Sequence, residues 1–263
     1  MLKKRIIFTL LFYDKFFTLS RNFRLQKVGD INWLRKNYKF NQTTDSIDEL
    51  IILNTRPSIE NRKLFIDTVN KLSSNCFIPI SVGGGIDDLD YAKTLLRNGA
   101  DKIVINSIIF HNERKVTELA NNFGKQCVVA SIDYKINKKN EFEVYVNSGK
   151  ENTGISLQKY LKKILTLPIG EIFLNSIDKD GTGQGMELSV LDLIPKNIHT
   201  PLIFSGGVGK WEHIYESIKS DKVDAVATAN LFNFVNNGLE LTRYELYKKG
   251  IKIPLWKNEK FKM

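Results

Sequence analysis

The chain has 263 residues, 42% of them hydrophobic, which is enough for one large hydrophobic core. Its 39 basic and 29 acidic side chains give a formal net charge of +10, but the lysines are scattered and no nucleic-acid motif accompanies them, so we do not expect nucleic-acid binding. No apolar run reaches the roughly 20 residues of a membrane helix, and Asp14 and Lys15 interrupt the only signal-like segment, so neither a membrane span nor a signal peptide is expected.

Eight short β-branched runs alternate with amphipathic segments that are rich in Lys and Glu. This alternation is typical of βα units and a parallel sheet. The predicted strands are 5–12, 49–54, 78–82, 102–105, 127–133, 171–176, 202–205 and 225–228. Eight units in about 260 residues are the expected size of a (β/α)8 TIM barrel. No Pro-, Gly- or Ser-rich linker divides the chain, so we expect a single domain over 1–263.

The two halves of the predicted barrel repeat one pattern. The segment SVGGG at 81–85 recurs as FSGGV at 204–208, and SID occurs at both 131–133 and 176–178. In each half a short strand follows the glycines and ends in small or polar residues: Asn106 and Ser107 in the first half, Thr228 and Ala229 in the second. We therefore expect an internally duplicated barrel.

One insertion breaks this rhythm after the fifth predicted strand. Residues 134–152 are typical of a β-hairpin, with Lys139 and Asn140 at the turn and an alternating strand over 141–146. A loop at the catalytic face of a barrel is a natural substrate lid.

The glycine-rich strand ends are candidates for phosphate binding, because glycine lets the backbone approach an anion and the loops after strands seven and eight bind phosphate in many barrels. A single Gly-Gly pair is more often only a turn. Two pairs in corresponding places predict two phosphate sites that face each other across one mouth, with a bisphosphate or an elongated anion as ligand. The residues expected there are Gly84, Gly85, Asn106, Ser107, Asp180, Gly181, Gly206, Gly207, Thr228 and Ala229.

Asp133 ends the fifth predicted strand, where an inward-facing carboxylate can act as a general acid or base. The alternative is a carboxylate that only caps a helix or anchors the hairpin. Residues 178–183 form a polar loop after the sixth strand that either orders over a substrate or is simply a turn.

Cysteine and histidine residues give no sign of a metal or redox site. Cys76 and Cys127 lack the spacing of a zinc or redox motif, and the three histidines are isolated in sequence. We therefore expect no metal, no cofactor and a reducing, cytoplasmic environment.

Four predicted strands begin with a charged residue: Arg5, Glu49, Lys102 and Glu171. Charges that point into a barrel floor are costly unless they are paired. Two basic and two acidic residues can neutralise one another in a ring around the barrel axis. Outward-pointing strand-end charges are the simpler alternative from the residues alone.

These motifs together resemble HisF, the cyclase subunit of imidazole glycerol phosphate synthase. The matching stretches cover essentially the whole chain in order: 1–7, 47–50, 82–86, 99–102, 131–133, 148–154, 176–182 and 205–210. The resemblance implies a barrel that binds a bisphosphate ribonucleotide at its C-terminal face and a HisH-type glutaminase at its N-terminal face. It also implies that ammonia enters through a salt-bridged gate of Arg5, Glu49, Lys102 and Glu171, and that Asp101 is a docking residue.

The resemblance further implies two catalytic aspartates, of which Asp133 matches the second while Leu11 stands at the position of the first. Leucine cannot exchange a proton, and loss of a general acid or base typically costs about 10²- to 10⁴-fold in rate. Nearby, Leu19 stands at a lysine of the family, and Asn54, followed by Arg56 and Pro57, stands at an aspartate. Asp14 would need a shifted strand register to replace the missing acid.

Two functions of different classes follow. The favoured one is a HisF-like paralog that conducts ammonia to a separate amidotransferase for amidination of a surface sugar, as in lipopolysaccharide biosynthesis. The alternative is an active cyclase subunit, a lyase of histidine biosynthesis. A related sugar-phosphate isomerase shares the half-barrel duplication, but the hairpin after Asp133 and the four strand-start charges argue against it.

Overall fold

Eight parallel strands form a closed ring in the computed structural model, which describes residues 3–37, 46–74, 76–196, 198–229 and 238–254. The ring closes because β1 pairs with β4 and β12, while β10 pairs with β7 and β11. Its strands are β1 (Arg5–Tyr13), β4 (Glu49–Asn54), β5 (Ile80–Gly83), β6 (Lys102–Ile105), β7 (Val128–Ile136), β10 (Glu171–Ser176), β11 (Leu202–Ser205) and β12 (Ala225–Thr228). The predicted (β/α)8 barrel is confirmed. Residues 1 and 2 of the first HisF-like stretch lie outside the described residues.

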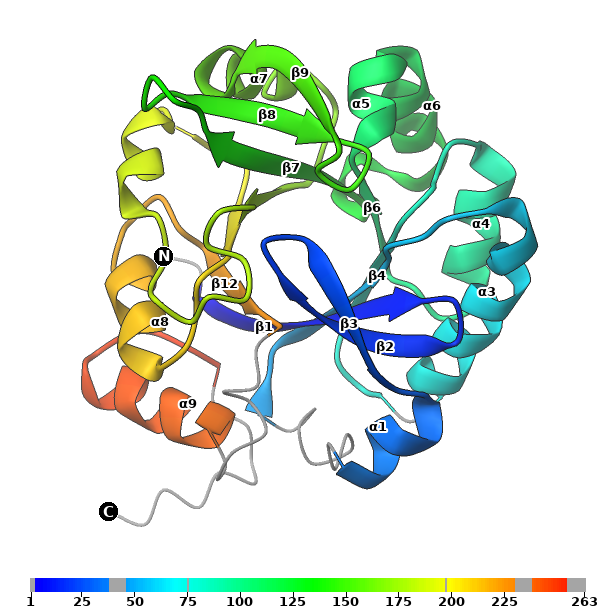
Figure 1. Ribbon diagram of the computed structural model, residues 1–263, viewed down its shortest axis with the longest axis horizontal. Helices are drawn as coiled ribbons and strands as arrows, with labels where there is room; N and C mark the ends of the chain where they lie inside the picture. Colours follow the sequence, from blue (N-terminus) through cyan, green and yellow to red (C-terminus); the bar gives the residue numbers. More distant parts are fainter. Residues whose placement is uncertain (1–2, 38–45, 75, 197, 230–237, 255–263) are drawn as a thin grey trace.

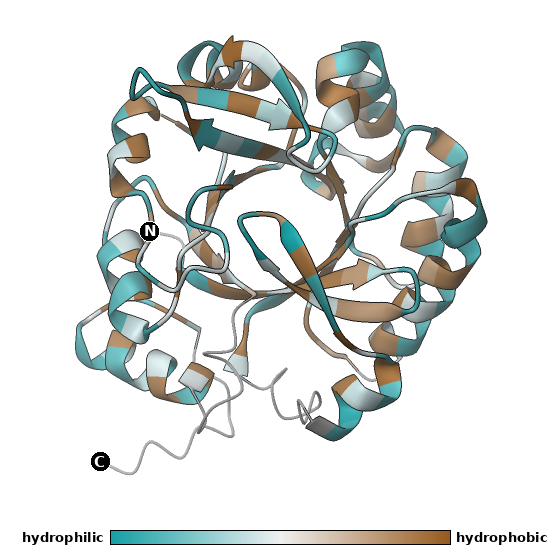
Figure 2. Cartoon of the chain, viewed as in Figure 1, coloured by the Kyte–Doolittle hydropathy of each residue, from teal (hydrophilic) through white to brown (hydrophobic). Residues whose placement is uncertain are grey.

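Helices surround the ring (Figure 1) and show both hydrophobic and hydrophilic positions, whereas the ring strands are mainly hydrophobic (Figure 2). In α3, for example, the Ser58 hydroxyl accepts a hydrogen bond from the Asn61 amide, and Phe65, Val69 and Leu72 form a buried stripe. The helices are α1 (Ile31–Asn37), α3 (Ile59–Ser73), α4 (Leu89–Arg97), α5 (Ser107–His111), α6 (Glu113–Phe123), α7 (Leu157–Ile164), α8 (Trp211–Ile218) and α9 (Gly238–Lys248), with 3-10 turns at Lys125–Cys127 and Leu188–Leu193.

The barrel interior is built in layers because inward side chains recur every second residue along a strand. Along β6, Lys102 at the floor is followed by Val104 in the middle, and Asn106 lies at the mouth just after the strand. Strand β10 repeats this order with Glu171, Phe173 and Asn175. The middle layer is a separate apolar cluster of Ile7, Ile51, Val104, Val129, Phe173, Ile203, Ala225 and Ala227. Charged floor, apolar middle and polar mouth thus follow from the strand register.

A hairpin that we did not predict follows β1. Its strands, β2 (Phe16–Arg21) and β3 (Arg24–Gly29), continue the sheet from β1 and cross the open end of the ring (Figure 1). The tight turn between them places Asn22 and Phe23 at φ of +52° and +61°. A phenylalanine in this left-handed region is uncommon, so the segment carries no glycine turn signal that sequence reasoning could detect.

The hairpin predicted after the fifth strand is confirmed, because β7 pairs antiparallel with the strand that follows it. Its turn at Asn140 has a positive φ, and β8 (Phe142–Val146) agrees with the prediction. The insertion continues beyond the predicted end at residue 152, because a further strand, β9 (Glu151–Ser156), pairs with β8. Tyr134, at the start of the predicted hairpin, is fully buried within β7. Strand β9 lacks an apolar alternation, since its residues alternate only between half-buried and exposed.

Candidate functional site

The four strand-start charges form a closed ring at the floor of the barrel. One guanidinium nitrogen of Arg5 lies 2.5 Å from Glu49 Oε1 and 2.9 Å from Glu171 Oε1. Lys102 Nζ lies 3.0 Å from Glu49 Oε1 and 3.2 Å from Glu171 Oε2. The side chains are only 6–19% exposed. The inward, mutually neutralising arrangement is therefore the one the chain adopts.

The two glutamates of the ring favour the charged form of Arg5. Burial disfavours the charge of Arg5, but Glu49 and Glu171 outweigh burial and raise the pKa of the guanidinium. The neighbouring Asp101 precedes Lys102 at the same end of the barrel, and its carboxylate accepts a hydrogen bond from the Ile80 amide at 2.8 Å. The two basic and two acidic residues of the ring give it a formal net charge of zero, and the exposed Asp101 lies beside it.

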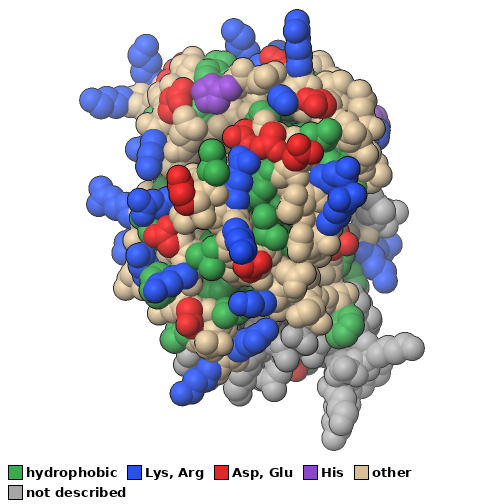
Figure 3. Space-filling model, turned by 90° about the vertical axis from the view of Figure 1, so that its right-hand side faces the viewer, with side chains coloured by type: hydrophobic (Ala, Val, Ile, Leu, Met, Phe, Trp, Pro, Cys, Tyr) green, Lys and Arg blue, Asp and Glu red, His purple; other side chains and the backbone are tan. Residues whose placement is uncertain are grey.

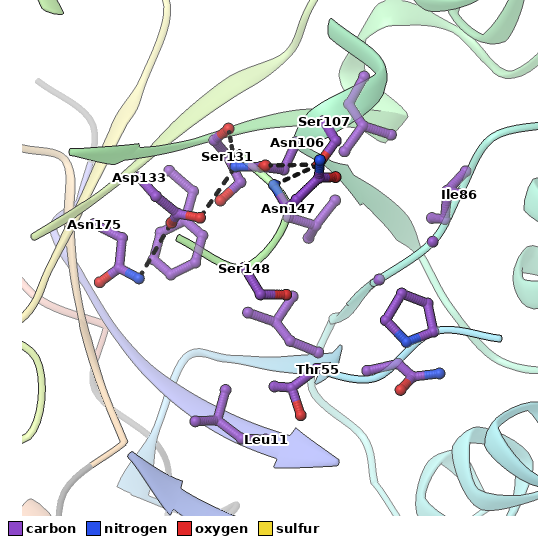
Figure 4. A pocket seen from close by; sticks show the side chains of 18 of the residues that line it. Leu11, Thr55, Ile86, Asn106, Ser107, Ser131, Asp133, Asn147, Ser148 and Asn175 are labelled. Carbon is purple, nitrogen blue, oxygen red and sulfur yellow. Dashed lines mark hydrogen bonds between the residues drawn. The ribbon is translucent and has the colours of Figure 1, made fainter. Parts of the chain in front are cut away.

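A cavity of about 520 Å³ lies at the opposite, C-terminal end of the strands. Figure 4 shows Asp133, Asn106 and Asn175 on one side of it and Leu11 on the other. It brings together residues from both halves of the barrel that the sequence analysis singled out: Leu11, Gly84, Gly85, Asn106, Ser107, Asp133, Asp180 and Ala229.

Asp133 is the titratable group best suited to proton transfer here. Asn106 Nδ2 donates to Asp133 Oδ2 at 3.2 Å, and Asn175 Nδ2 donates to Oδ1 at 3.4 Å. The carboxyl is 8% exposed, and burial raises its pKa to about 7, with the two amides opposing the shift and Asp180 adding to it. A carboxyl with this pKa can gain or lose a proton near neutral pH.

On the other side of the cavity, Leu11 provides no titratable group. Leu11 pairs in register with Leu53, and Phe23, Thr9 and Thr55 also line the cavity. None of these side chains exchanges a proton near neutral pH. Asp14 does not replace the missing acid. It lies in the turn after β1 at φ +57°, where Asn61 donates to its carboxylate at 2.9 Å and Arg56 pairs with it at 3.4 Å.

A second cavity of about 240 Å³ lies beside the first, on the other face of the β2–β3 hairpin. It contains the remaining residues expected at the phosphate sites: Gly181, Gly206, Gly207 and Thr228, together with Asp180 and Ala229, which line both cavities. The residues of the two expected sites thus lie in two neighbouring cavities, with the hairpin between them. Phosphate binding at these positions stays a prediction.

The hairpin also supplies cavity residues that sequence reasoning missed. Ser20, Phe23 and Leu25 line the larger cavity, whereas Leu19, Arg21, Arg24 and Gln26 line the smaller one, together with Ser20. The register explains this division, because cross-strand neighbours project from the same face of a hairpin and the pairs are Leu19 with Gln26, Ser20 with Leu25, and Arg21 with Arg24.

The glycines at the strand ends have a steric reason independent of any ligand. Gly84, Gly206 and Gly207 have φ near +100°, where other residues are strained. A Cβ on Gly207 would lie 2.1 Å from the Gly185 carbonyl oxygen, and one on Gly84 would lie 2.2 Å from the Asn54 carbonyl oxygen. Glycine is therefore required at these turns, whether or not an anion binds there.

On the face of the described structure that Figure 3 shows, the basic side chains do not gather into a patch. Lys and Arg side chains are spread among acidic ones over the face in Figure 3 instead of forming one continuous patch. Within the described ranges, no cluster of three or more potential His, Cys, Asp or Glu metal ligands occurs. None of the described helices combines the length and the apolar character that a membrane crossing requires.

Comparison with known proteins agrees with this geometry. The family model described as histidine biosynthesis protein matches residues 26–236. A protein of Parasynechococcus marenigrum named "Putative imidazole glycerol phosphate synthase subunit hisF2" is 41% identical over 97% of this chain and 95% of its own length. The imidazole glycerol phosphate synthase subunit HisF of Clostridium botulinum is 36% identical over 88% of this chain and 90% of its own length. The chain therefore belongs to the HisF family of histidine biosynthesis proteins.

Proposed function

We propose that this chain is the synthase subunit of a glutamine amidotransferase complex, in which it receives ammonia from a HisH-type glutaminase and conducts it through the barrel. It does not close the imidazole ring efficiently but delivers the ammonia to a separate amidotransferase that amidinates a surface sugar. One contrast carries this proposal: the floor ring is complete, whereas Leu11 occupies the side of the mouth opposite Asp133.

The floor ring supports an entrance role. Glutaminase docking at this end, around Asp101, would place an ammonia source directly below the four charges. Lysine has a flexible stem and a single charged group, so Lys102 is the member that can swing aside while Arg5 keeps its contacts with both glutamates. Ammonia is neutral, so the charges of the ring do not repel it, and it can pass once Lys102 has moved aside.

The barrel interior above the ring supports conduction. The Oε2 atom of Glu49, the Ser81 hydroxyl and the Thr9 hydroxyl are buried and have no hydrogen-bond partner among the described residues. They lie on β4, β5 and β1, strands that contribute to the inner wall. Buried polar groups normally have partners, so these atoms offer hydrogen bonds to a small polar molecule on its way to the mouth.

The cavity at the C-terminal mouth of the barrel supports a loss of the cyclisation reaction. A cyclisation that needs both a proton donor and a proton acceptor finds Asp133 on one side and an aliphatic side chain on the other. Asp180 also lines the cavity, but the Ser20 hydroxyl and the Phe23 amide both donate to its Oδ2. The free thiols of Cys76 and Cys127 fit the cytoplasmic location that we propose for the complex.

The alternative function is an active cyclase of histidine biosynthesis, and Asp133 favours it because its pKa near 7 suits acid-base catalysis. Turnover of the bisphosphate ribonucleotide precursor by the purified chain with excess ammonium salt separates the two functions. We expect a rate at least about 10²-fold below that of a cyclase with both acids. A comparable rate would establish the cyclase instead.

The conduction role has its own test in the complex with a HisH-type glutaminase and the acceptor enzyme. We expect Lys102→Ala to reduce the amidinated product per glutamine hydrolysed, because an incomplete ring lets ammonia escape. Lys125→Ala, at an exposed lysine that precedes β7 at the same barrel end, is the matched control. Equal coupling in both variants would refute conduction through the ring.

A further inference from the structure

The β2–β3 hairpin is held in a fixed position across the mouth by its tip. The Asn22 amide donates to the Asp180 carbonyl at 2.9 Å, and Asn22 Nδ2 donates to the Asp178 carbonyl at 2.8 Å. The Phe23 amide donates to Asp180 Oδ2 at 3.0 Å. These contacts join the hairpin to the loop after β10, in the other half of the barrel. The hairpin therefore offers a partner a surface that is already ordered, which lowers the cost of binding.

Strand β3 has one edge without a partner strand. It pairs with β2 along one edge, and no described strand pairs with the other. Both residues of the hairpin turn have positive φ, as in a type I′ turn, so the flanking residues Arg21 and Arg24 are joined by the hydrogen bond of the turn. Bonded and non-bonded positions alternate along an antiparallel pair. The backbone amides and carbonyls of Leu25 and Lys27 therefore point to the open edge.

The hairpin that carries this edge is strongly basic. Between residues 15 and 29 the chain has four basic residues and no acidic one. The nearest acid before them, Asp14, already pairs with Arg56 at 3.4 Å. The four basic side chains are exposed and take part in none of the ion pairs among the described residues: Lys15, Arg21, Arg24 and Lys27.

These charges determine which strand can join the edge. An open edge is a template for a further strand, and basic side chains on it oppose pairing with an identical strand. A second copy of β3 would bring Arg24 and Lys27 close to the same cations, and facing like charges are destabilising. An extended segment with acidic side chains gains attraction at the same positions. The edge thus rejects a copy of itself and accepts an acidic strand.

The position of the edge suits the last step of ammonia transfer. The floor ring closes one end of the barrel, and the hairpin crosses the other end, where the larger cavity opens (Figure 1). Leu25, on β3 itself, lines that cavity and is 37% exposed. Ile59, at the start of α3, is 80% exposed at the same end of the barrel. A partner held on β3 would lie over the mouth and find apolar side chains to bury.

We propose that the open edge of β3 is the docking site for the acceptor enzyme, which adds an extended, acidic segment to the hairpin as a further strand. This inference rests on the proposed function for the existence of a separate acceptor enzyme, and it names the surface that holds that enzyme. Backbone hydrogen bonds at Leu25 and Lys27 fix the segment, and the basic side chains select an acidic one. Ammonia then passes from the larger cavity into the acceptor enzyme instead of into solvent.

Binding of the purified sugar amidotransferase to the full chain in complex with its glutaminase tests the proposal. Arg24→Glu with Lys27→Glu is expected to weaken binding at least tenfold in interferometry, because two attractive charges become repulsive. Lys138→Glu with Lys139→Glu makes the same change in net charge at exposed lysines in the turn between β7 and β8, and should change binding less than twofold. Equal losses in both pairs, or no loss in the hairpin pair, would overturn the proposal.

Hydrogen exchange distinguishes strand addition from attraction by charge alone. When the amidotransferase binds the wild-type chain, we expect amides of residues 24–29 to exchange at least about tenfold more slowly, because those of Leu25 and Lys27 gain partners. The amides of β9, which pairs only with β8 and so has an open edge of its own, are the reference and should not change. Unchanged exchange at 24–29 in the bound complex would overturn strand addition at β3.

Failure of this docking site and failure of the proposed function give different results. If the amidotransferase binds but neither the hairpin variant nor the exchange involves β3, the docking site is wrong and the delivery of ammonia stands. If amidinated product forms from glutamine without measurable binding, the docking site is wrong as well. If the three proteins neither bind nor form amidinated product, the proposed function is refuted and the docking site with it.

Discussion

Asn106 and Asp133 are hydrogen-bonded across the ends of the neighbouring strands β6 and β7, with Asn106 Nδ2 3.2 Å from Asp133 Oδ2. The amide favours the ionised carboxyl, but burial opposes ionisation more strongly and raises the pKa of Asp133 to about 7. The mouth thus retains one carboxyl that is poised for proton transfer, in a cavity that has Leu11 on its other side. The cost of keeping this carboxyl buried is measurable.

Asp133→Asn should stabilise the protein at pH 8 and have little effect at pH 4. The pKa of Asp133 is higher in the folded than in the unfolded state, so wild-type stability falls as pH rises from about 4 to 7 and stays lower above that. The gain at pH 8 has an upper limit of about 4 kcal/mol. Urea unfolding at both pH values measures it, and an equal change at both would show that the variant acts through packing.

Leu11→Asp should raise the ammonia-dependent cyclase rate by at least about tenfold, because it restores a second acid-base group opposite Asp133. Leu53→Asp is the matched control. Leu53 pairs with Leu11 in register and lines the same cavity, so this variant adds an equal charge on the neighbouring strand. We expect no rate increase from it.

The rate is measured by steady-state turnover with saturating ammonium salt, after circular dichroism has shown that both variants are folded. A folded Leu11→Asp protein without any rate gain would show that Leu11 is not the principal lesion. The differences at Leu19 and Asn54, which line the smaller and the larger cavity respectively, would then also limit the reaction.

The sequence predicted the barrel well because its strands are apolar, β-branched runs with clear ends. Five predicted strands, at 49–54, 102–105, 171–176, 202–205 and 225–228, have the observed bounds. Strand β7 was predicted too short because it leaves the barrel and continues into the insertion as far as Ile136. The pattern of apolar residues within a strand does not show at which residue the strand exchanges one neighbouring strand for another.

The floor ring and the divided mouth were harder to predict. From the residues alone, Arg5 and Glu171 are ordinary strand-end charges. Only the resemblance to HisF predicted that these side chains point into the barrel, where they form an ion pair in the structure. The division of the mouth depends on Asn22 and Phe23 in a turn that has no glycine. Its consequence, two cavities instead of one, arises from long-range contacts with Asp180.

The floor ring should show strong energetic coupling. Lys102→Ala leaves Glu49 and Glu171 with only Arg5 as a partner, and Glu171→Ala leaves two cations around one carboxylate. Each single change is expected to cost about 1–3 kcal/mol, because the ring is mostly but not fully buried. The double variant removes one charge of each sign and should cost less than the sum.

A double-mutant cycle from chemical unfolding measures this coupling, which we expect to exceed about 0.5 kcal/mol. The pair Lys115 and Glu118, an ion pair on the surface of α6, provides the control cycle, with a coupling of about 0.2–0.5 kcal/mol. If the ring gave no more coupling than this helical pair, its charges would be acting independently.

The strongest single effect on stability is expected at Arg243, in α9 near the carboxyl end of the described chain. Its side chain is fully buried and pairs with Asp48 at 3.1 Å, and the Ile6 amide donates to the same carboxylate oxygen at 2.7 Å. Burial raises the pKa of Asp48 even though Arg243 opposes the shift. Arg243→Met therefore leaves a buried carboxylate whose pKa rises further.

This variant should lose about 3–5 kcal/mol at pH 8 and clearly less at pH 5, where a carboxyl with a raised pKa takes up a proton more easily. Guanidinium chloride unfolding at the two pH values measures the difference, with Arg97→Met, at an exposed arginine in α4, as the control. A loss that did not depend on pH would assign the role of Arg243 to packing. A loss at pH 8 that exceeds the loss at pH 5 ties α9 to the start of the barrel through charge, because Asp48 also holds the backbone of β1 next to Arg5.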